Sequence, residues 1–258
     1  MASIDHGALG QELYTALRSR VVVPPLKGRV PGITIDDSYH ISRAMLDLRL
    51  ADGEKVVGKK IGVTSPAVQN MLGVHQPDFG WLTDAMVYSG QMPISQLLIQ
   101  PKAEGEIAFT LKDSLVGPGI TEADVLAATA TVHPCFEVVD SRIADWKIGI
   151  EDTVADNASS GLYVIGDGVD PAGVDFEGCT MVVHKNGQLL SEGHGRAALG
   201  SPLTCVAWLA NTMAKFGISL WAGETILSGS LVPLESVQAG DHMHVSIEGI
   251  GSTEVQFT

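Results

Sequence analysis

Two glutamates interrupt an otherwise apolar stretch of the sequence, Ala103–Leu111, and this stretch constrains the fold more than any other. It is typical of a β-strand, in which successive side chains point to opposite faces. Glu104 and Glu106 therefore share one face, while apolar side chains such as Phe109 share the other and belong in a core. The two carboxylates lie roughly 7 Å apart along the strand, and each raises the pKa of the other unless a cation lies between them.

A third glutamate, Glu137, lies within a second apolar segment, Pro134–Asp140. A lone charge in such a segment is costly to bury unless it is paired. If the three carboxylates converge, they form a hard oxygen site that suits Mg²⁺ or Mn²⁺. The alternative is that the first two lie on a solvated face and that Glu137 pairs with a basic residue such as Arg142. The pattern alone leaves both interpretations open.

Two adjacent lysines, Lys59 and Lys60, lie between Gly58 and Gly62 in a strand-like segment. Alternation along a strand turns only one of them inward. An inward lysine beside a metal site can hold an anionic carboxylate or transfer a proton, because the pKa of lysine shifts readily on burial. The alternative is a pair of exposed strand lysines.

Two loops are also rich in polar groups. The first, His75–Gly80, contains Asp78, which is a candidate acid–base group or a turn-forming residue that bonds to its own backbone. The second, Val154–Gly161, combines small residues with many hydrogen-bonding groups, as ligand-binding loops and simple turns both do.

The apolar periodicity predicts an α+β fold with a strand-rich core. Helices are expected at the N-terminus, where Leu9, Leu13 and Leu17 recur every four residues, and over residues 36–50. Ser65 and Ser201, each followed by proline, predict helices that end near Gly73 and Gly217. The expected strands cover 56–63, 107–111, 136–139, 162–165, 180–184, 188–190, 225–227, 243–247 and 255–257. We therefore expect a helical N-terminal region over residues 1–54 and a core over residues 55–258.

Composition excludes several classes of function. A net charge of −14 over 258 residues argues against a nucleic-acid surface, which needs clustered cations. No apolar run approaches the length of a membrane span, and three scattered cysteines fit buried thiols in a reducing, cytoplasmic setting. A mean hydropathy of +0.20 with only 18% charged residues favours a homo-oligomer that hides apolar surface between its subunits. The dinucleotide-binding, phosphate-loop and nucleophile-elbow motifs are absent from the sequence.

Six short segments occur in the order and with the spacing of the 2-oxopent-4-enoate (2-hydroxypenta-2,4-dienoate) hydratases of the catechol meta-cleavage pathway. The chain resembles this family from Leu13 to its last residue. These hydratases are related to 4-oxalocrotonate decarboxylases and, more distantly, to fumarylacetoacetate hydrolases. The six segments are GKKIGVT (Gly58–Thr64), QPDFG (Gln76–Gly80), AEGEI (Ala103–Ile107), EVVDSR (Glu137–Arg142), DTVADNAS (Asp152–Ser159) and IGS (Ile250–Ser252).

The resemblance implies a fumarylacetoacetate-hydrolase-like core of mixed β-sheets. It implies a Mg²⁺ or Mn²⁺ ion held by Glu104, Glu106 and Glu137. It places the functional lysine at Lys60, with Lys59 facing solvent, and a second catalytic group at Asp78. Substrate-binding positions follow at Ser159 and, by a weaker correspondence, Ser228.

The implied activity is the metal-dependent hydration of 2-hydroxypenta-2,4-dienoate to 4-hydroxy-2-oxopentanoate. The nearest alternatives are a 4-oxalocrotonate decarboxylase and a partner subunit that stabilises one, since family members associate with that decarboxylase. The Asp78 loop favours the hydratase. Hydrolysis of a C–C bond in an acylpyruvate is disfavoured, because the sequence shows no His–Glu pair on the N-terminal side of the core.

Overall fold

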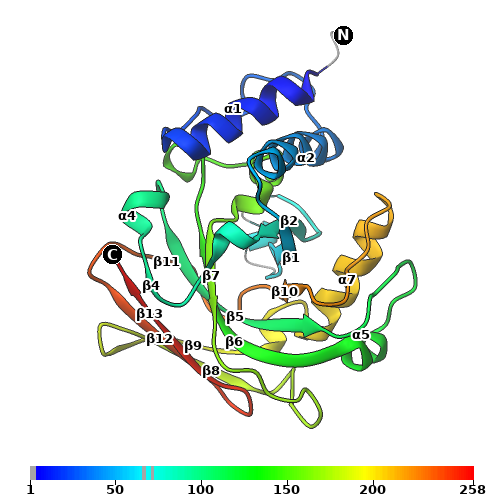
Figure 1. Ribbon diagram of the computed structural model, residues 1–258, viewed down its shortest axis with the longest axis vertical. Helices are drawn as coiled ribbons and strands as arrows, with labels where there is room; N and C mark the ends of the chain where they lie inside the picture. The colour runs from blue at the N-terminus through cyan, green and yellow to red at the C-terminus, as the bar shows by residue number, and fades with distance from the viewer. Residues whose placement is uncertain (1–3, 66–67, 71–72) are drawn as a thin grey trace.

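The computed structural model describes residues 4–65, 68–70 and 73–258, which form two β-sheets and a helical N-terminal layer (Figure 1). Helices α1 (His6–Ser19) and α2 (Ile35–Ala51) pack against each other at one end of the molecule. Asp5 caps the first helix, and Thr34 forms a capping box with Asp37 at the second. Both predicted helices are therefore confirmed. Their apolar faces form a cluster that includes Leu13 and Ile41 and extends to Ile143.

The larger sheet has the strand order β2-β1-β10-β5-β6-β7-β3, and β11 pairs with β5 off this path. Its strands are β1 (Val56–Gly62), β2 (Asp78–Thr83), β3 (Val87–Tyr88), β5 (Lys102–Leu111), β6 (Thr129–Val139), β7 (Leu162–Ile165), β10 (Thr225–Leu227) and β11 (Glu235–Ser236). Parallel and antiparallel pairs both occur, because β1 runs parallel to β10 while β5 runs antiparallel to both β6 and β10. The expected mixed sheet and α+β class are confirmed.

This sheet cannot be flat, because a short link joins its two ends. Strands β2 and β3 end the strand order, yet only the 3₁₀ turn η1 (Asp84–Met86) separates them along the chain. Four peptide steps span at most about 14 Å, whereas seven flat strands would place the two end strands about 29 Å apart. The sheet therefore rolls up and encloses one of its faces.

The enclosed face carries a small apolar cluster at one end of the roll. Its fully buried members are Leu82, Met86, Ala108, Cys135, Tyr163 and Leu227. Strand alternation places Glu104 and Glu106 of β5, and Lys60 of β1, on this same face. The interior of the roll is thus divided into an apolar part and a charged part.

The second sheet covers the outer face of the first. It has the order β4-β13-β12-β8-β9, with β4 (Gly90–Met92), β8 (Thr180–Lys185), β9 (Gln188–His194), β12 (His242–Ile247) and β13 (Gly251–Phe257). The predicted hairpin β8–β9 turns at Asn186-Gly187, where both φ angles are positive, as a type I′ turn requires. Met181 of β8 packs so closely over Gly105 that a Cβ atom at residue 105 would approach its sulfur to 2.6 Å.

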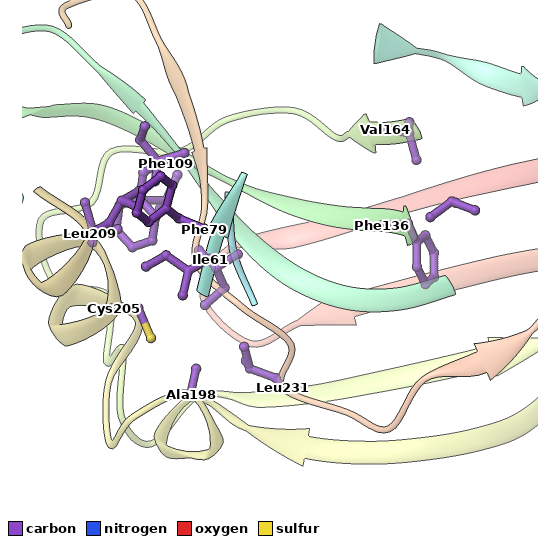
Figure 2. Close-up of a cluster of buried hydrophobic side chains, with 14 of the residues drawn as sticks. Ile61, Phe79, Phe109, Phe136, Val164, Ala198, Cys205, Leu209 and Leu231 are labelled. Carbon is purple, nitrogen blue, oxygen red and sulfur yellow. The ribbon is translucent and has the colours of Figure 1, made fainter. Parts of the chain in front are cut away.

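The main core lies between these layers and helix α7 (Pro202–Ala214), which is capped by Ser201 as predicted (Figure 2). Phe109 and Phe79 lie beside Leu209 and Cys205 of this helix, and all three cysteines are buried and free. The remaining helices are α4 (Ile94–Leu97), α5 (Glu122–Ala128) and α6 (Ile150–Ala155), with 3₁₀ turns η2 (Ala144–Trp146), η3 (Asn157–Ser159) and η4 (Gly195–Ala197).

Two expectations about the fold need correction or restriction. The segment 75–80 is not wholly a turn-rich loop, since Asp78 already begins strand β2. The helix expected from Ser65 to Gly73 includes residues 66–67 and 71–72, which lie outside the described residues. The boundary between residues 54 and 55 stays a prediction. Among the residues that the structure describes, no helix combines the length and apolar character needed to cross a bilayer.

Replacing Phe109 by alanine should lower the free energy of unfolding by about 3–5 kcal/mol. Phe109 is fully buried, and its ring stacks on Phe176 at a centroid distance of 5.5 Å, so the truncation leaves a cavity between sheet and helix. Urea unfolding monitored by circular dichroism measures the change. Val116→Ala is the control, because that side chain is 61% exposed and its loss should cost less than about 0.5 kcal/mol. Equal losses in the two variants would contradict the assignment of this core.

Candidate metal centre and active site

Three carboxylates meet on the enclosed face of the larger sheet. Glu104 and Glu106 project from the same side of β5, and the register of the antiparallel pair places Glu137 of β6 directly opposite Glu104. One carboxylate oxygen from each residue lies within 4.8 Å of the others. Glu106 and Glu137 are buried and Glu104 is half-buried. The predicted convergence is confirmed, and the alternative of a solvated face is wrong for Glu106.

The carboxylate oxygens of this cluster have few hydrogen-bond partners among the described residues. Glu106 accepts a hydrogen bond at Oε2 from the Gly229 backbone N–H, at 2.8 Å. Its Oε1, and both oxygens of Glu137, are buried without a hydrogen-bond partner in the described part of the chain. Buried carboxylate oxygens are rarely left in this way. Because one oxygen from each of the three carboxylates lies within 4.8 Å of the others, the cluster fits a divalent cation that prefers oxygen ligands.

Burial raises the pKa of all three carboxyl groups, because it penalises the charged form. The charge of Glu137, followed by that of Glu104, adds to this rise at Glu106, whose pKa lies well above its usual value. At Glu137, burial outweighs the opposing charge of Lys60, and its pKa rises to about 7. The cluster therefore binds protons or a cation at neutral pH.

Lys60 reaches this cluster from β1. Its ammonium lies 3.3 Å from Oε2 of Glu137 and donates a hydrogen bond to the Ala158 carbonyl oxygen at 3.0 Å. Burial by itself would lower the pKa of Lys60, but the charges of Glu137, Asp78 and the other carboxylates outweigh burial and hold the pKa above its usual range. Lys60 is therefore a fixed ammonium at neutral pH.

The expectation that Lys59 faces solvent is wrong. Its side chain is as buried as that of Lys60, with 2% of each residue exposed. It points to the opposite face of β1, where its ammonium lies 2.5 Å from the carboxylate of Glu224. Both faces of β1 are covered, so strand alternation separates two buried environments and not an interior from solvent.

Asp78 lies beside Lys60, because β2 pairs Asp78 with Gly62 and Lys60 precedes Gly62 by two residues on the same face. A Cβ atom at residue 62 would approach Oδ1 of Asp78 to 2.4 Å, so a larger residue there would displace the Asp78 carboxyl group. Burial raises the pKa of Asp78, although Lys60 opposes the rise. A carboxyl group with a raised pKa keeps its proton more readily than an exposed one, which makes Asp78 a candidate for acid–base catalysis.

Ser159 lies in a strained turn. Asn157, Ala158 and Ser159 have φ angles of 55°, 50° and 52°, and each such non-glycine residue costs about 1–3 kcal/mol. Oγ of Ser159 lies 3.1 Å from Oγ1 of Thr153, which in turn lies 3.5 Å from Oδ2 of Asp78. The turn thus brings a hydroxyl group to the same place as Asp78. The sequence pattern points to the loop at residues 154–161, but it does not indicate that Thr153 lies between Ser159 and Asp78.

Ser228 has a different environment. Its hydroxyl donates to the Ile107 carbonyl oxygen at 2.8 Å, so its hydrogen is committed to the backbone. The next residue, Gly229, has a φ angle of 95° and holds Glu106 through its N–H. Ser228 therefore aligns the segment that supports a candidate ligand, and direct contact with a substrate stays a prediction.

The sequence leaves open that Glu137 pairs with a nearby arginine or lysine. Arg142, the nearest arginine in the sequence, instead pairs with Asp156, at 2.5 Å between Nε and Oδ1, and lies 3.9 Å from Asp140. Lys60 takes the position next to Glu137. The segments EVVDSR and DTVADNAS are thus joined by the ion pair between Arg142 and Asp156. The sequence does not predict this pair, because the two residues are 14 positions apart.

The chain is similar to known proteins over most of its length. Residues 67–258 match the family described as fumarylacetoacetate (FAA) hydrolase C-terminal. The chain is 69% identical over 214 residues to a 2-hydroxypent-2,4-dienoate hydratase from Pseudomonas putida, covering 82% of this chain and 96% of that protein. It is 58% identical over 253 residues to a 2-hydroxyhexa-2,4-dienoate hydratase from Comamonas testosteroni, covering 96% of each.

A solved structure, 4-oxalocrotonate decarboxylase from Pseudomonas putida G7 complexed with magnesium and adipate, matches with a TM-score of 0.94. The sequence identity is 35%, over 98% of this chain and 97% of that one.

Glu106→Gln should weaken Mg²⁺ binding by more than about 100-fold, since even the loss of a group that only supports a ligand costs 10–100-fold. The amide keeps the shape of the side chain but removes a charge from the cluster. Isothermal titration calorimetry with MgCl₂ measures the affinity. Glu192→Gln, on an exposed part of β9, is the control and should leave the affinity unchanged. Unaltered Mg²⁺ binding in Glu106→Gln would contradict the assignment of this site.

The stability of the metal-free protein should fall as pH rises from about 4.5 to about 7. A carboxyl group whose pKa is raised on folding binds more protons in the folded than in the unfolded chain across this window, so the free energy of unfolding decreases with pH. Urea unfolding over a pH series with EDTA measures the slope. The slope should become shallower in Glu137→Gln, and saturating Mg²⁺ should abolish it by compensating the charge. A wild-type slope equal to that of Glu137→Gln would contradict the raised pKa.

Proposed function

The chain belongs to the fumarylacetoacetate hydrolase family, and we propose that it is a metal-dependent hydratase acting on 2-hydroxypenta-2,4-dienoate. The product is 4-hydroxy-2-oxopentanoate, and the reaction belongs to catechol degradation by meta-cleavage. One observation carries the proposal. In a chain 69% identical to such a hydratase, a buried carboxyl group, Asp78, and a buried ammonium, Lys60, lie next to a cluster of three carboxylates.

The cluster of Glu104, Glu106 and Glu137 would hold Mg²⁺ or Mn²⁺. When bound, the ion supplies Lewis-acid stabilisation of negative charge on the C2 oxygen of the substrate. Three carboxylates would supply only part of the oxygen ligands that Mg²⁺ prefers, so oxygen atoms of the substrate or of water would complete the set. Three carboxylates, one ammonium and one divalent ion together are neutral, so a monoanionic substrate enters without strong repulsion.

The side chains around the cluster can supply the charge and the proton transfers that hydration requires. The dienol becomes a ketone with a proton at C5, water adds at C4, and a proton at C3 completes the product. Lys60 supplies fixed positive charge beside the C2 oxygen as charge develops there. Asp78 is the candidate group that takes a proton from the dienol or from the attacking water. Ser159 offers a hydroxyl group to the substrate next to Asp78.

The second candidate is a 4-oxalocrotonate decarboxylase, which the overall structural match favours. Its dicarboxylate substrate would bring a further negative charge into the roll, beside the buried carboxyl group of Asp78. The identity to hydratases is also higher, at 69% and 58%, than the 35% to the decarboxylase. Both arguments favour hydration. A homo-oligomer and a complex with a partner decarboxylase remain predictions from the sequence.

The purified chain, stripped of metal and reloaded with Mg²⁺ or Mn²⁺, should convert freshly made 2-hydroxypenta-2,4-dienoate into 4-hydroxy-2-oxopentanoate. Loss of the dienol absorbance follows the rate, and NMR identifies the product. Asp78→Asn should lower kcat by about 100-fold or more while retaining Mg²⁺ binding, because its amide cannot exchange the proton. Release of CO₂ from 2-oxohex-3-enedioate without turnover of the dienol would replace the hydratase by the decarboxylase.

A further inference from the structure

Arg142 is fully buried and uses its whole guanidinium group on one segment. Nε donates to Oδ1 of Asp156 at 2.5 Å, one terminal nitrogen donates to the Asp156 carbonyl oxygen at 2.6 Å, and the other donates to the Ser160 carbonyl oxygen at 2.9 Å. The backbone N–H of Arg142 also donates to Oδ2 of Asp156 at 2.8 Å. Such a planar fork fixes geometry in a way that a lysine cannot.

The two carbonyl groups that Arg142 binds lie on either side of the strained turn. Residues 157–159, all with positive φ, lie between Asp156 and Ser160. An unrestrained chain of these residues would relax toward negative φ. Asn157 adds a second tether, because its side chain accepts from Trp81 N–H at 2.8 Å and donates to the Trp81 carbonyl at 2.9 Å. Arg142 therefore holds the turn at both ends, and Asn157 fixes it to β2.

The middle of this turn touches the functional lysine. The Ala158 carbonyl oxygen accepts a hydrogen bond from Lys60 at 3.0 Å, while Oε2 of Glu137 lies 3.3 Å from the same ammonium nitrogen. The carbonyl therefore takes one of the three ammonium hydrogens and limits how the group can turn. Without the carbonyl, the flexible lysine would turn toward the carboxylates.

We propose that Arg142 is a positioning residue, which holds the 157–159 turn so that the Ala158 carbonyl aims the Lys60 ammonium. The consequence for catalysis rests on the proposed function, whereas the consequence for the lysine does not. Loss of the fork should change kcat more than substrate affinity, because Arg142 makes no contact with the three candidate metal ligands and reaches the substrate only through the turn that carries Ser159. The loss should appear in kcat, since a displacement of about 1 Å can cost about 100-fold.

Arg142→Lys tests the fork while it keeps the buried positive charge. We expect kcat for the dienol to fall by about 100-fold, with a smaller change in KM, of about tenfold or less, through Ser159. Arg49→Lys is the matched control, because Arg49 is also buried and paired with a carboxylate, Glu54, and its side-chain hydrogen bonds go to Glu54 and Thr83. Equal losses of kcat in the two variants would overturn the proposal, since both would then report general destabilisation.

A second readout is independent of turnover. In uniformly nitrogen-labelled, metal-free protein, heteronuclear NMR detects ammonium groups that are buried and hydrogen-bonded. Lys60 and Lys59 should both give signals in the wild type, and only the Lys60 signal should shift or vanish in Arg142→Lys. Lys59 is an internal reference because it binds Glu224 on the other face of the strand. An unchanged Lys60 signal would overturn the proposal even if the protein proves not to be a hydratase.

The double variant Arg142→Lys/Ala158→Gly provides rescue. Glycine adopts positive φ without strain and keeps the carbonyl group at residue 158. We expect the double variant to restore the Lys60 signal and to have a kcat about tenfold or more above that of Arg142→Lys. It also carries the test if Arg142→Lys alone is too unstable to purify. A folded double variant that resembles the single variant in both readouts would overturn the link between the fork and the turn.

Discussion

Mutual repulsion among three closely spaced carboxylates is the constraint on which the rest of the site depends. Burial raises the pKa of each carboxyl group, Glu104 adds to the rise at Glu106 and Glu137, and the charge of Lys60 opposes it. The single ammonium of Lys60 offsets part of this charge, and a divalent cation offsets the remainder. The fold can hold these charges together because the larger sheet rolls around them. Strand β1 lies two positions from β5 in the strand order, and the roll brings its Lys60 to the cluster.

Rigid backbone contacts fix the side chains around this charge. Gly62 lets Asp78 approach β1, and Gly229 supplies the N–H that holds Glu106. The turn at residues 157–159 is costly in itself, and Arg142 and Asn157 hold it in place. Strain of this kind is typical of sites whose geometry must be set before the ligand arrives. The strained turn therefore lowers the stability of the fold, and in return it keeps the polar groups of the site apart.

Local patterns predicted much of this arrangement. Alternation in 103–111 was enough to place two glutamates on one face, and the Asn-Gly pair was enough to place a hairpin. The errors arose where the partner was distant in sequence. Lys59 seemed exposed because alternation cannot reveal that both faces of β1 are covered, and Arg142 stayed open as a partner for Glu137 because Asp156 was not known to lie beside it. The sequence around Asp78 is typical of a turn. Only the pairing of Asp78 with Gly62 of β1 shows that a strand begins there.

The register of β5 and β6 has a consequence for the order in which the site assembles. Residues 112–128 alone connect these two strands, whereas Lys60 joins them through β10, which comes from near the other end of the chain. Pairings that close a short loop form with less loss of chain entropy than distant ones. The carboxylates can therefore come together in a hairpin-like intermediate that still lacks the lysine. At that stage their repulsion is uncompensated, so a cation that binds early would speed folding as well as complete the site.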